Sequence, residues 1–370
     1  MTAKKRYDYL IVGAGLFGST FAYLASKAGK RCLVIDKRSH PGGNCHSEDI
    51  LGINVHLYGP HIFHTSNKET WKFVDSLSPM KPFFNQPIAR YRGEQFNLPF
   101  NMNTFRQIYG NLSVCEIKKR IDTDRVVSQN VNNLEEYALS TVGVSIYEKL
   151  IKGYTEKQWG RPCKELPASF VKRLPLRMSY DNLYFSDQYQ GVPEKGYGHL
   201  FSKLLENCDV VLNCDYLENI GSLKEMAYKI LYTGRLDKLF GESNLEFRGL
   251  RFVNKIIDFD ETQGCAVVNY TDSSVPYTRT TEHLYFNPPE NPDISVITYE
   301  YPIECIHQDD VECYPVLTEN NKIIQSKLLM RAKAERSMIF GGRLADYQYF
   351  NMDTTIEKAI DLWKKEQRNV

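Results

Sequence analysis

The sequence feature that most constrains the fold is a glycine-rich turn between two apolar stretches near the N-terminus. Residues 7–12 are apolar and run directly into Gly13, Gly15 and Gly18, which form the pattern G-x-G-x-x-G. The third glycine lies within an amphipathic segment, and a second apolar stretch ends at Asp36. A strand, turn, helix and strand in this order predict a dinucleotide site, with the pyrophosphate on N–H groups at the start of the helix.

Each residue type in this turn has a separate physical role. Gly13 allows the tight turn, Gly15 lets the backbone approach a pyrophosphate, and Gly18 lets the helix pack closely on the strand. The carboxylate of Asp36 suits hydrogen bonds from an adenosine ribose, and it disfavours a 2′-phosphate because two anions would repel each other. The motif therefore leaves NAD and FAD as alternatives.

Length, charge and cysteine content exclude several other classes of protein. A chain of 370 residues can bury a large core, and its net charge of +1 gives no indication of nucleic-acid binding. No apolar run is long enough to span a membrane, and the short segment before the first strand leaves no room for a signal peptide. The nine cysteines lack metal-ligand spacing, which favours reduced thiols. We therefore expect a cytoplasmic protein without a metal site.

The rest of the chain changes its periodicity twice. From about Asn103 to Leu176 the pattern is mainly helical and predicts a small helical bundle. Apolar side chains recur there at three- and four-residue spacing in residues 105–109, 114–121, 134–139 and 144–152. Residues 250–301 alternate in the manner of an antiparallel sheet. Residues 338–343 predict a short strand that meets two glycines, and a final helix is expected from about Asp353.

Several further segments are typical of one enzyme family. They are Gly42-Gly43-Asn44 and residues 58–65, 96–101, 152–160, 189–193, 276–279 and 340–343. Together with the first glycine turn, these segments extend over nearly the whole chain. In this set of segments the chain resembles UDP-galactopyranose mutase of the bacterial type. The resemblance implies an isomerase that interconverts UDP-galactopyranose and UDP-galactofuranose and supplies furanose for a cell-surface polysaccharide. It also implies reduced FAD as the working cofactor, with its N5 atom bonded to the sugar while UDP departs.

The fold implied by pattern and resemblance together is α/β. A Rossmann-like FAD-binding domain is expected to be interleaved with a small helical bundle and an antiparallel β-sheet domain. The expected FAD-binding domain is discontinuous and comprises residues 1–84, 190–240 and 325–370. The expected mainly helical domain covers residues 98–189 with a mobile lid near 164–178, and the expected substrate domain comprises residues 85–97 and 241–324.

The residues implied at the cofactor come from both glycine turns and from the closing segment of the chain. They are Gly13, Gly15, Phe17, Gly18, Asp36, Lys37, Gly43, Asn44, His61, Ile62, Arg343, Phe350, Asn351, Met352 and Thr355. His61 is expected beside the isoalloxazine ring as a neutral imidazole that tunes the ring or its N5 hydrogen bonding. The closing helix is expected to direct its positive end toward the flavin.

The implied catalytic set is Arg173, Arg279 and His61. Two guanidinium groups would stabilise the charge on the departing UDP and hold it for return, and Arg173 falls in the stretch that resembles the family's lid. Phenols expected at the phosphates are Tyr184, Tyr314 and Tyr349. The other implied substrate residues are Asn85, Tyr154, Thr155, Trp159, Phe185, Asn269 and Glu300.

Two positions depart from the family pattern. Asn351 stands where the family has aspartate, so a charge is lost there. Arg235 stands where the family has proline, and this change is expected to loosen a turn and add a cation. These departures leave open a mutase for another nucleotide sugar, such as an N-acetylated or deoxy hexose. A flavin oxidase or dehydrogenase and a non-catalytic nucleotide-sugar binding protein are further alternatives. A homodimer and an external flavin reductant are expectations from the resemblance.

Overall fold

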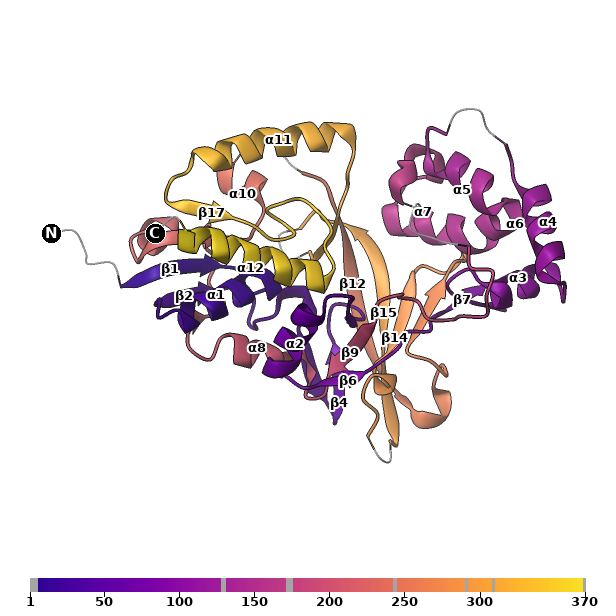
Figure 1. The fold of residues 1–370 in the computed structure, drawn as a ribbon, viewed down its shortest axis with the longest axis horizontal. Helices are drawn as coiled ribbons and strands as arrows, with labels where there is room; N and C mark the ends of the chain where they lie inside the picture. The colour runs from indigo at the N-terminus through magenta and orange to yellow at the C-terminus, as the bar shows by residue number, and fades with distance from the viewer. Residues whose placement is uncertain are drawn as a thin grey trace.

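The computed structural model describes residues 6–127, 131–170, 176–241, 245–289, 292–307 and 310–368. Figure 1 shows strands and helices from both ends of the chain at left, a cluster of helices at upper right, and long strands between these two regions. None of the helices in the described residues is long and apolar enough to cross a bilayer.

A parallel sheet forms the centre of the left-hand region. Its strand order is β10-β2-β1-β11-β17, and every neighbouring pair is parallel. The strands are β1 (Tyr7–Val12), β2 (Cys32–Ile35), β10 (Asp209–Val211), β11 (Ala227–Tyr232) and β17 (Met338–Phe340). All of them fall in apolar stretches that predict strands, and parallel strands of this kind are typical of a Rossmann-like fold.

Helices cover both faces of this sheet. On one face, α1 (Leu16–Lys27) and α12 (Met352–Arg368) lie side by side although they come from opposite ends of the chain (Figure 1). The rings of Tyr9, Phe21 and Trp363 meet edge to face there, and the Phe21 and Trp363 centroids are 5.4 Å apart. The same core includes side chains of α2 (Lys68–Leu77) and α8 (Gly196–Leu204). The opposite face packs against α9 (Ile220–Lys224), α10 (Leu236–Phe240) and α11 (Glu319–Ala334).

A second sheet of seven strands joins the left-hand region to the helical cluster. Its order is β16-β12-β15-β14-β13-β7-β8, and only the pair β13 and β7 is parallel. The strands are β7 (Ile88–Tyr91), β8 (Glu94–Asn97), β12 (Phe247–Asp258), β13 (Val267–Tyr270), β14 (Arg279–Glu282), β15 (Ile294–Glu304) and β16 (Glu312–Pro315). The register places Arg279 opposite Asn269 on one neighbour and opposite Glu300 on the other. Three polar side chains predicted at the substrate therefore lie in one row across the sheet.

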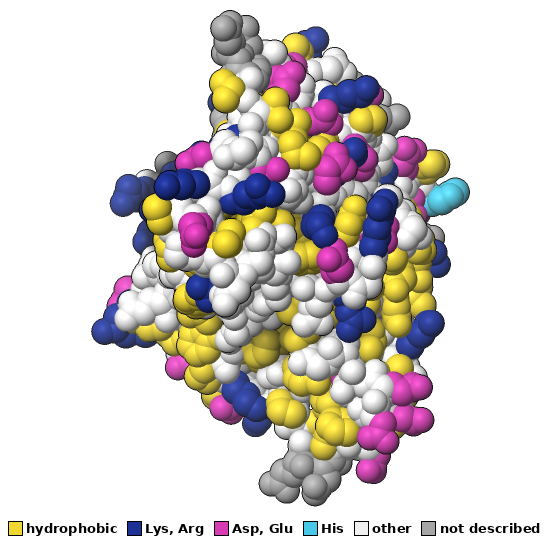
Figure 2. Space-filling view, turned by 90° about the vertical axis from the view of Figure 1, so that its right-hand side faces the viewer, with side chains coloured by type: hydrophobic (Ala, Val, Ile, Leu, Met, Phe, Trp, Pro, Cys, Tyr) yellow, Lys and Arg dark blue, Asp and Glu magenta, His cyan; other side chains and the backbone are white. Residues whose placement is uncertain are grey.

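The helical cluster contains α3 (Met102–Tyr109), α4 (Val114–Asp124), α5 (Leu134–Val142), α6 (Val144–Ile146), a π-helical segment η2 (Tyr147–Lys152) and α7 (Gly153–Trp159). Side chains of Asn101, Ser113 and Asn133 cap the first long helices by accepting from backbone N–H groups. Lysines, arginines and carboxylates are interspersed on the face that includes this cluster, in keeping with a net charge near zero (Figure 2).

The remaining strands form two small sheets. One pairs β3 (Ser47–Ile50) with β4 (Ile53–His56), and the other has the order β5-β9-β6. The strands of the second are β5 (Phe63–Thr65), β6 (Met80–Pro82) and β9 (Tyr189–Pro193). The short 3₁₀ turns are η1 (Gly43–Cys45), η3 (Cys163–Glu165), η4 (Ala168–Phe170), η5 (Phe259–Glu261) and η6 (His283–Tyr285).

The structure differs from the sequence expectations at particular elements. The alternating stretch 280–286 is a strand only to Glu282 and continues as the turn η6. Helix α11 was not expected, because its apolar residues are spread around the helix instead of forming one stripe. The predicted α/β class is confirmed, since a parallel Rossmann-like sheet, a helical cluster and a mainly antiparallel sheet are all present.

Candidate functional site

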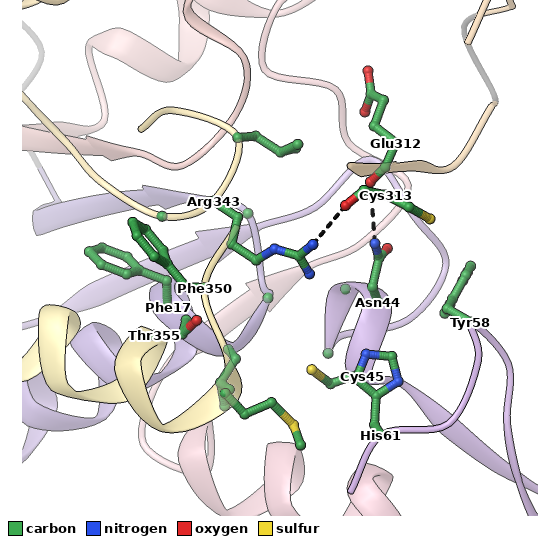
Figure 3. Close-up of a pocket in the computed structure, with 18 of the residues that line it drawn as sticks. Phe17, Asn44, Cys45, Tyr58, His61, Glu312, Cys313, Arg343, Phe350 and Thr355 are labelled. Atoms are coloured by element: carbon green, nitrogen blue, oxygen red, sulfur yellow. Dashed lines mark hydrogen bonds between the residues drawn. The ribbon is translucent and has the colours of Figure 1, made fainter. Parts of the chain in front are cut away.

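A cavity of about 500 Å³ opens at the carboxyl ends of β1 and β2 and continues along the seven-stranded sheet. Its walls come from the two glycine turns, from the segment after β4, from β13, β14, β15 and β16, and from the start of α12. Ligands of open parallel sheets bind at this edge of the sheet. Figure 3 shows part of the wall, with Arg343 and Phe17 on one side and Tyr58 on the other.

The first glycine turn leaves space for a ligand at one of its three glycines. Gly13 has φ +106°, and a Cβ there would lie 2.1 Å from Thr233 Oγ1. A Cβ on Gly18 would lie 2.1 Å from the carbonyl oxygen of Gly13. A Cβ on Gly15, in contrast, would meet no atom of the described residues within 4 Å. Gly15 is also the N-cap of α1, where no side chain caps the helix, so the N–H groups there are available to a phosphate.

The second glycine turn packs directly on the first. The N–H of Gly42 donates to the carbonyl oxygen of Ala14 at 2.8 Å, and a Cβ on Gly43 would lie 3.2 Å from Gly15 Cα. Asn44 follows this turn and donates through Nδ2 to the carbonyl oxygen of Glu312 at 3.3 Å (Figure 3). The second turn thus fixes the wall opposite the start of α1.

Asp36 and Arg38 are held at the edge of the cavity by backbone contacts and neighbouring side chains. The carboxylate of Asp36 accepts from the N–H of Ala14 at 2.8 Å and from the N–H of Arg38 at 2.9 Å. The guanidinium of Arg38 donates to Asn44 Oδ1 at 2.9 Å and lies 4.6 Å from the centre of the Tyr58 ring. Its Nη1 is buried and has no hydrogen-bond partner among the described residues. A buried, unpaired cationic donor beside an open glycine turn fits an anionic ligand such as a dinucleotide pyrophosphate.

The closing segment of the chain forms the opposite corner. Arg343 donates through Nη2 to the carbonyl oxygen of Cys313 at 2.7 Å, and its guanidinium lies 4.7 Å from the Tyr349 ring centre (Figure 3). The ring of Phe17 fills the space beside Gly341, where a Cβ would approach to 2.4 Å. Helix α12 begins beside the cavity, so its N-terminal N–H groups supply positive potential there.

His61 is a neutral imidazole in the wall of the cavity. Its Nδ1 lies 2.9 Å from the carbonyl oxygen of Gly59, which accepts a hydrogen bond from Nδ1–H in the neutral ring. Burial lowers the pKa of His61 to about 4, and the charges of Arg343 and Arg279 act in the same direction. At neutral pH Nε2 is therefore the hydrogen-bond acceptor of this ring.

Arg279 is the centre of a polar network at the substrate end of the cavity. It donates through Nε to Asn269 Oδ1 at 3.1 Å and through Nη2 to the hydroxyl of Tyr154 at 3.0 Å. Its Nη1 lies 3.5 Å from Glu300 Oε2. Burial opposes the charge on Arg279, but Glu300 and the tyrosines around it raise the pKa of the guanidinium well above its usual value. The site therefore carries a fixed cation at neutral pH.

Tyrosines surround this guanidinium. Burial raises the pKa of Tyr184 and Tyr314, so both phenols are protonated and can donate hydrogen bonds at neutral pH. Tyr314 and Tyr349 stack with ring centroids 5.9 Å apart and an interplanar angle of 21°. A cation with several phenol donors around it suits a diphosphate.

The structure brings together most of the predicted site residues. Every residue predicted at the cofactor lines this cavity. Of the predicted substrate residues, those that also line it are Asn85, Tyr184, Phe185, Asn269, Arg279, Glu300, Tyr314 and Tyr349.

Three predicted substrate residues do not line the cavity, because they belong to α7 in the helical cluster. Tyr154 contacts the site through its hydrogen bond with Arg279, and Trp159 contacts it through its ring, whose centroid lies 6.1 Å from that of Tyr314. Thr155 is half-buried on the same helix. Arg173 and the part 171–175 of the predicted lid lie outside the described residues.

The sequence interpretation of Arg235 as a residue that loosens a turn was wrong. The Arg235 guanidinium is buried and donates to Asp237 Oδ1 at 3.1 Å, to Glu312 Oε1 at 3.0 Å and to the carbonyl oxygen of Leu245 at 2.9 Å. These contacts fasten the turn after β11 to β16. Both Arg235 and Glu312 line the cavity, and no local pattern in the sequence indicates this pairing.

His64 also lines the cavity and was not predicted as a site residue. Its Nδ1 lies 2.7 Å from Asp187 Oδ2, and its ring stacks on Phe185 with centroids 3.7 Å apart. The signal available in the sequence was its place in segment 58–65, three residues after His61. Its partner Asp187 is far along the chain, so the contact itself could not be inferred.

The fold and the cavity define a mixed α/β protein with a Rossmann-like nucleotide-binding domain and an adjoining polar cleft. A family model described as an NAD(P)-binding Rossmann-like domain matches residues 11–77, and one described as UDP-galactopyranose mutase matches residues 149–349. The chain belongs to the UDP-galactopyranose mutase family, as predicted. Members of this family are isomerases, and the family together with the fold implies a flavin cofactor.

Two curated relatives cover nearly the whole chain. It is 38% identical to dTDP-fucopyranose mutase of Escherichia coli, over 95% of this chain and 96% of the relative. It is 36% identical to a probable UDP-galactopyranose mutase of Klebsiella pneumoniae, over 95% and 93% of the two chains. A crystal structure of reduced UDP-galactopyranose mutase shares the fold with a TM-score of 0.74, at 14% identity over 99% of this chain and 95% of that one.

Proposed function

We propose that this protein is a flavin-dependent pyranose–furanose mutase that interconverts UDP-galactopyranose and UDP-galactofuranose. The observation that carries the proposal is that one continuous cavity joins the open glycine turn at Gly15 to the cationic network of Arg279. A cofactor and a nucleotide sugar would therefore meet within the same space, as a reaction between them requires.

FAD is the cofactor that we propose for the glycine turns. The open space at Gly15 and the unpaired Nη1 of Arg38 fit its pyrophosphate, and Asp36 is placed to accept from an adenosine ribose. Arg343, Phe350 and the start of α12 would hold the isoalloxazine ring. In its reduced form this ring would supply the nucleophile for the sugar.

The side chains at the substrate end bind and orient in this proposal. Arg279 would hold the diphosphate oxygens while the bond between sugar and nucleotide is broken, with phenol hydroxyls of Tyr184 and Tyr314 as further donors. Neutral His61 would accept a hydrogen bond through Nε2 without adding a charge next to the ring. Arg173 is proposed as the second guanidinium from the family resemblance alone.

A related nucleotide sugar is the second candidate substrate. The 38% and 36% identities to a dTDP-fucopyranose mutase and to a probable UDP-galactopyranose mutase are nearly equal. Asn351, which lines the cavity, also lacks the charge that the family pattern has at this position. A deoxy sugar linked to dTDP is therefore tested beside UDP-galactose. We further propose a cytoplasmic homodimer that depends on an external flavin reductant and supplies furanose for a cell-surface polysaccharide.

One assay tests the reaction and the substrate together. The purified protein is reduced with dithionite under anaerobic conditions and mixed with UDP-galactofuranose or dTDP-fucofuranose, and the products are separated by chromatography. We expect conversion to the pyranose while the flavin stays reduced, and the faster substrate identifies the preferred sugar. An oxidase or dehydrogenase would instead give no conversion with the reduced protein, and its oxidised flavin would be reduced stoichiometrically when mixed with the sugar. A colourless protein that binds UDP without turnover would indicate a binding protein.

A further inference from the structure

Within the described part of the chain, the hydrogen bonds of the Lys157 ammonium all go to backbone carbonyl groups. Its Nζ donates to the carbonyl oxygens of Tyr270 at 2.9 Å, Asp272 at 2.7 Å, Val275 at 3.0 Å and Tyr277 at 2.9 Å. An ammonium group has three N–H donors, so at least one of these contacts is shared. We name these four acceptors the carbonyl cage.

The carbonyl cage belongs to one connection between two strands of the site. Residues 271–278 join β13, which ends just after Asn269, to β14, which begins at Arg279. Lys157 lies on α7, the helix that also supplies the Tyr154 hydroxyl to Arg279. The ammonium therefore links the helical cluster to both strand ends that carry the cationic network.

The connection is shaped to receive this helix. A Cβ on Gly153, the first residue of α7, would lie 2.3 Å from the carbonyl oxygen of Thr271, so only glycine allows the close approach. The hydroxyl of Thr271 donates to the carbonyl oxygen of Lys149 at 2.6 Å, and the rings of Tyr270 and Tyr277 meet edge to face. Four converging carbonyl dipoles would repel one another without a cation between them.

We propose that Lys157 is a positioning residue of the nucleotide-sugar site, whose ammonium acts as a tethered monovalent cation. By filling the carbonyl cage it fixes the β13–β14 connection, and with it the distance between Arg279, Asn269 and Tyr154. This inference rests on the proposed function, because it assigns a cause to the geometry of that site. The proposal predicts that nucleotide affinity depends on the Lys157 ammonium, which occupies the carbonyl cage and does not line the cavity.

The charge state at neutral pH agrees with this role. Burial lowers the pKa of Lys157 to about 8, against the opposing field of Asp272. The Asp272 carboxylate accepts a hydrogen bond from the N–H of Ser274 at 2.9 Å, within the same β13–β14 connection. The ammonium form of Lys157 is therefore the majority form at pH 7.

Chemical rescue tests the proposal directly. Lys157→Ala removes the side chain beyond Cβ, and n-propylammonium replaces the missing atoms and the charge. UDP binding to the flavin-loaded protein is measured by calorimetry, and bound flavin is measured by absorbance. The matched control is Lys152→Met, which removes a half-buried lysine of the same cluster that pairs with Glu148 at 3.0 Å.

We expect Lys157→Ala to keep its flavin and to bind UDP at least about tenfold more weakly, because several charge-assisted hydrogen bonds are lost. Propylammonium should restore most of the affinity, its neutral isostere 1-propanol should not, and Lys152→Met should bind as the unmodified protein does. Unchanged affinity in Lys157→Ala would overturn the proposal. Weaker affinity that propylammonium fails to restore would also overturn it, since the loss would then be general disruption.

Two measurements separate this inference from the proposed function. Amide hydrogen exchange of residues 270–278 needs no nucleotide and should be faster in Lys157→Ala and slower again with propylammonium. If the unmodified protein binds no UDP, the proposed function fails. The exchange result still shows whether the Lys157 ammonium fixes the β13–β14 connection. Amine acetylation of the unmodified protein needs no variant. Lys157 should react more slowly than Lys152, and equal rates would contradict the cage.

Discussion

Arg235 shows how a single residue outside every motif can hold the wall of the site. Its guanidinium lies between Asp237 and Glu312, and the Asp237 side chain has 0% exposure. A buried carboxylate left without its partner is strongly destabilising. The contact joins the end of β11 to β16, so it also keeps two sides of the cavity together.

We therefore predict that Arg235→Met lowers the free energy of unfolding by about 3–5 kcal/mol, measured by chemical denaturation at pH 7. Arg161→Met is the matched control, because Arg161 pairs with Glu246 while 39% exposed. Its cost should stay below about 1 kcal/mol. Equal losses in the two variants would contradict the role given to Arg235.

Some residues of the cavity wall were predicted from one segment because local geometry imposes their type, whereas Arg279, Glu300 and Tyr314 were predicted from the family resemblance. Gly13 and Gly18 lie at the turn into α1 and Asp36 lies just after β2, so their pattern can be recognised within one strand–helix–strand segment. The ion pair of Arg235 with Glu312 depends on which strands become neighbours. No local pattern carries that information, and such residues appear only when the fold is known.

At the scale of elements, the glycines at the start of α1 are needed for different reasons. Gly18 is required by the protein, since a Cβ there would lie 2.1 Å from the carbonyl oxygen of Gly13. Gly15 has φ −72° and open space before it, so only a ligand requires the absence of its side chain. Gly13 and Gly18 are thus required by the protein itself, and Gly15 is the glycine that we propose meets the ligand.

We predict that Gly15→Ala keeps the unfolding stability of the flavin-free protein but loses most of its bound flavin, because the methyl group occupies the space for a pyrophosphate. Gly18→Ala should lower the stability of the flavin-free protein itself. Flavin absorbance per protein and denaturation of the flavin-free form measure the two effects. Full flavin content in Gly15→Ala would show that the ligand does not approach this glycine.

Elements were predictable where one periodicity dominated. The strands of the parallel sheet and helix α12 have clear apolar patterns, and the structure contains them. Helix α11 has no such stripe and was missed, although Thr318 caps it by accepting from the N–H of Asn321 at 3.2 Å. The stretch 144–152 reads as one helix, yet its second part is π-helical, which depends on packing in the cluster.

At the scale of the whole molecule, the buried His56 and His283 and the cavity-wall residue His61 link its stability to pH. The N–H of His61 donates to His56 Nδ1, and the N–H of His56 donates to His283 Nδ1, both at 3.2 Å. Each accepting ring must be neutral for this chain of contacts. Burial lowers the pKa of His61 to about 4 and that of His283 to about 3, and it lowers the pKa of His56 well below its usual value.

The unfolded chain binds protons on these rings below about pH 6.5, whereas the folded protein does not. Stability should therefore fall as the pH falls from about 6.5 toward 4, by up to about 1.4 kcal/mol per pH unit for each ring. Denaturation at a series of pH values measures how the free energy of unfolding depends on pH. His283→Gln should lower this slope by the contribution of one proton, about 1.4 kcal/mol per pH unit. The exposed His307 supplies the control His307→Gln, which should leave the slope unchanged. Identical slopes in all three proteins would contradict the neutral chain.

The central claim is that reduced flavin and nucleotide sugar meet in one cavity and become covalently joined during turnover. The most direct test is to add cyanoborohydride to the dithionite-reduced protein during turnover of UDP-galactose, and to measure the mass of the released flavin. The account predicts a flavin carrying one hexose, formed only by the reduced protein and suppressed by excess UDP. An unmodified flavin during rapid turnover, or equal turnover by the oxidised protein, would contradict it.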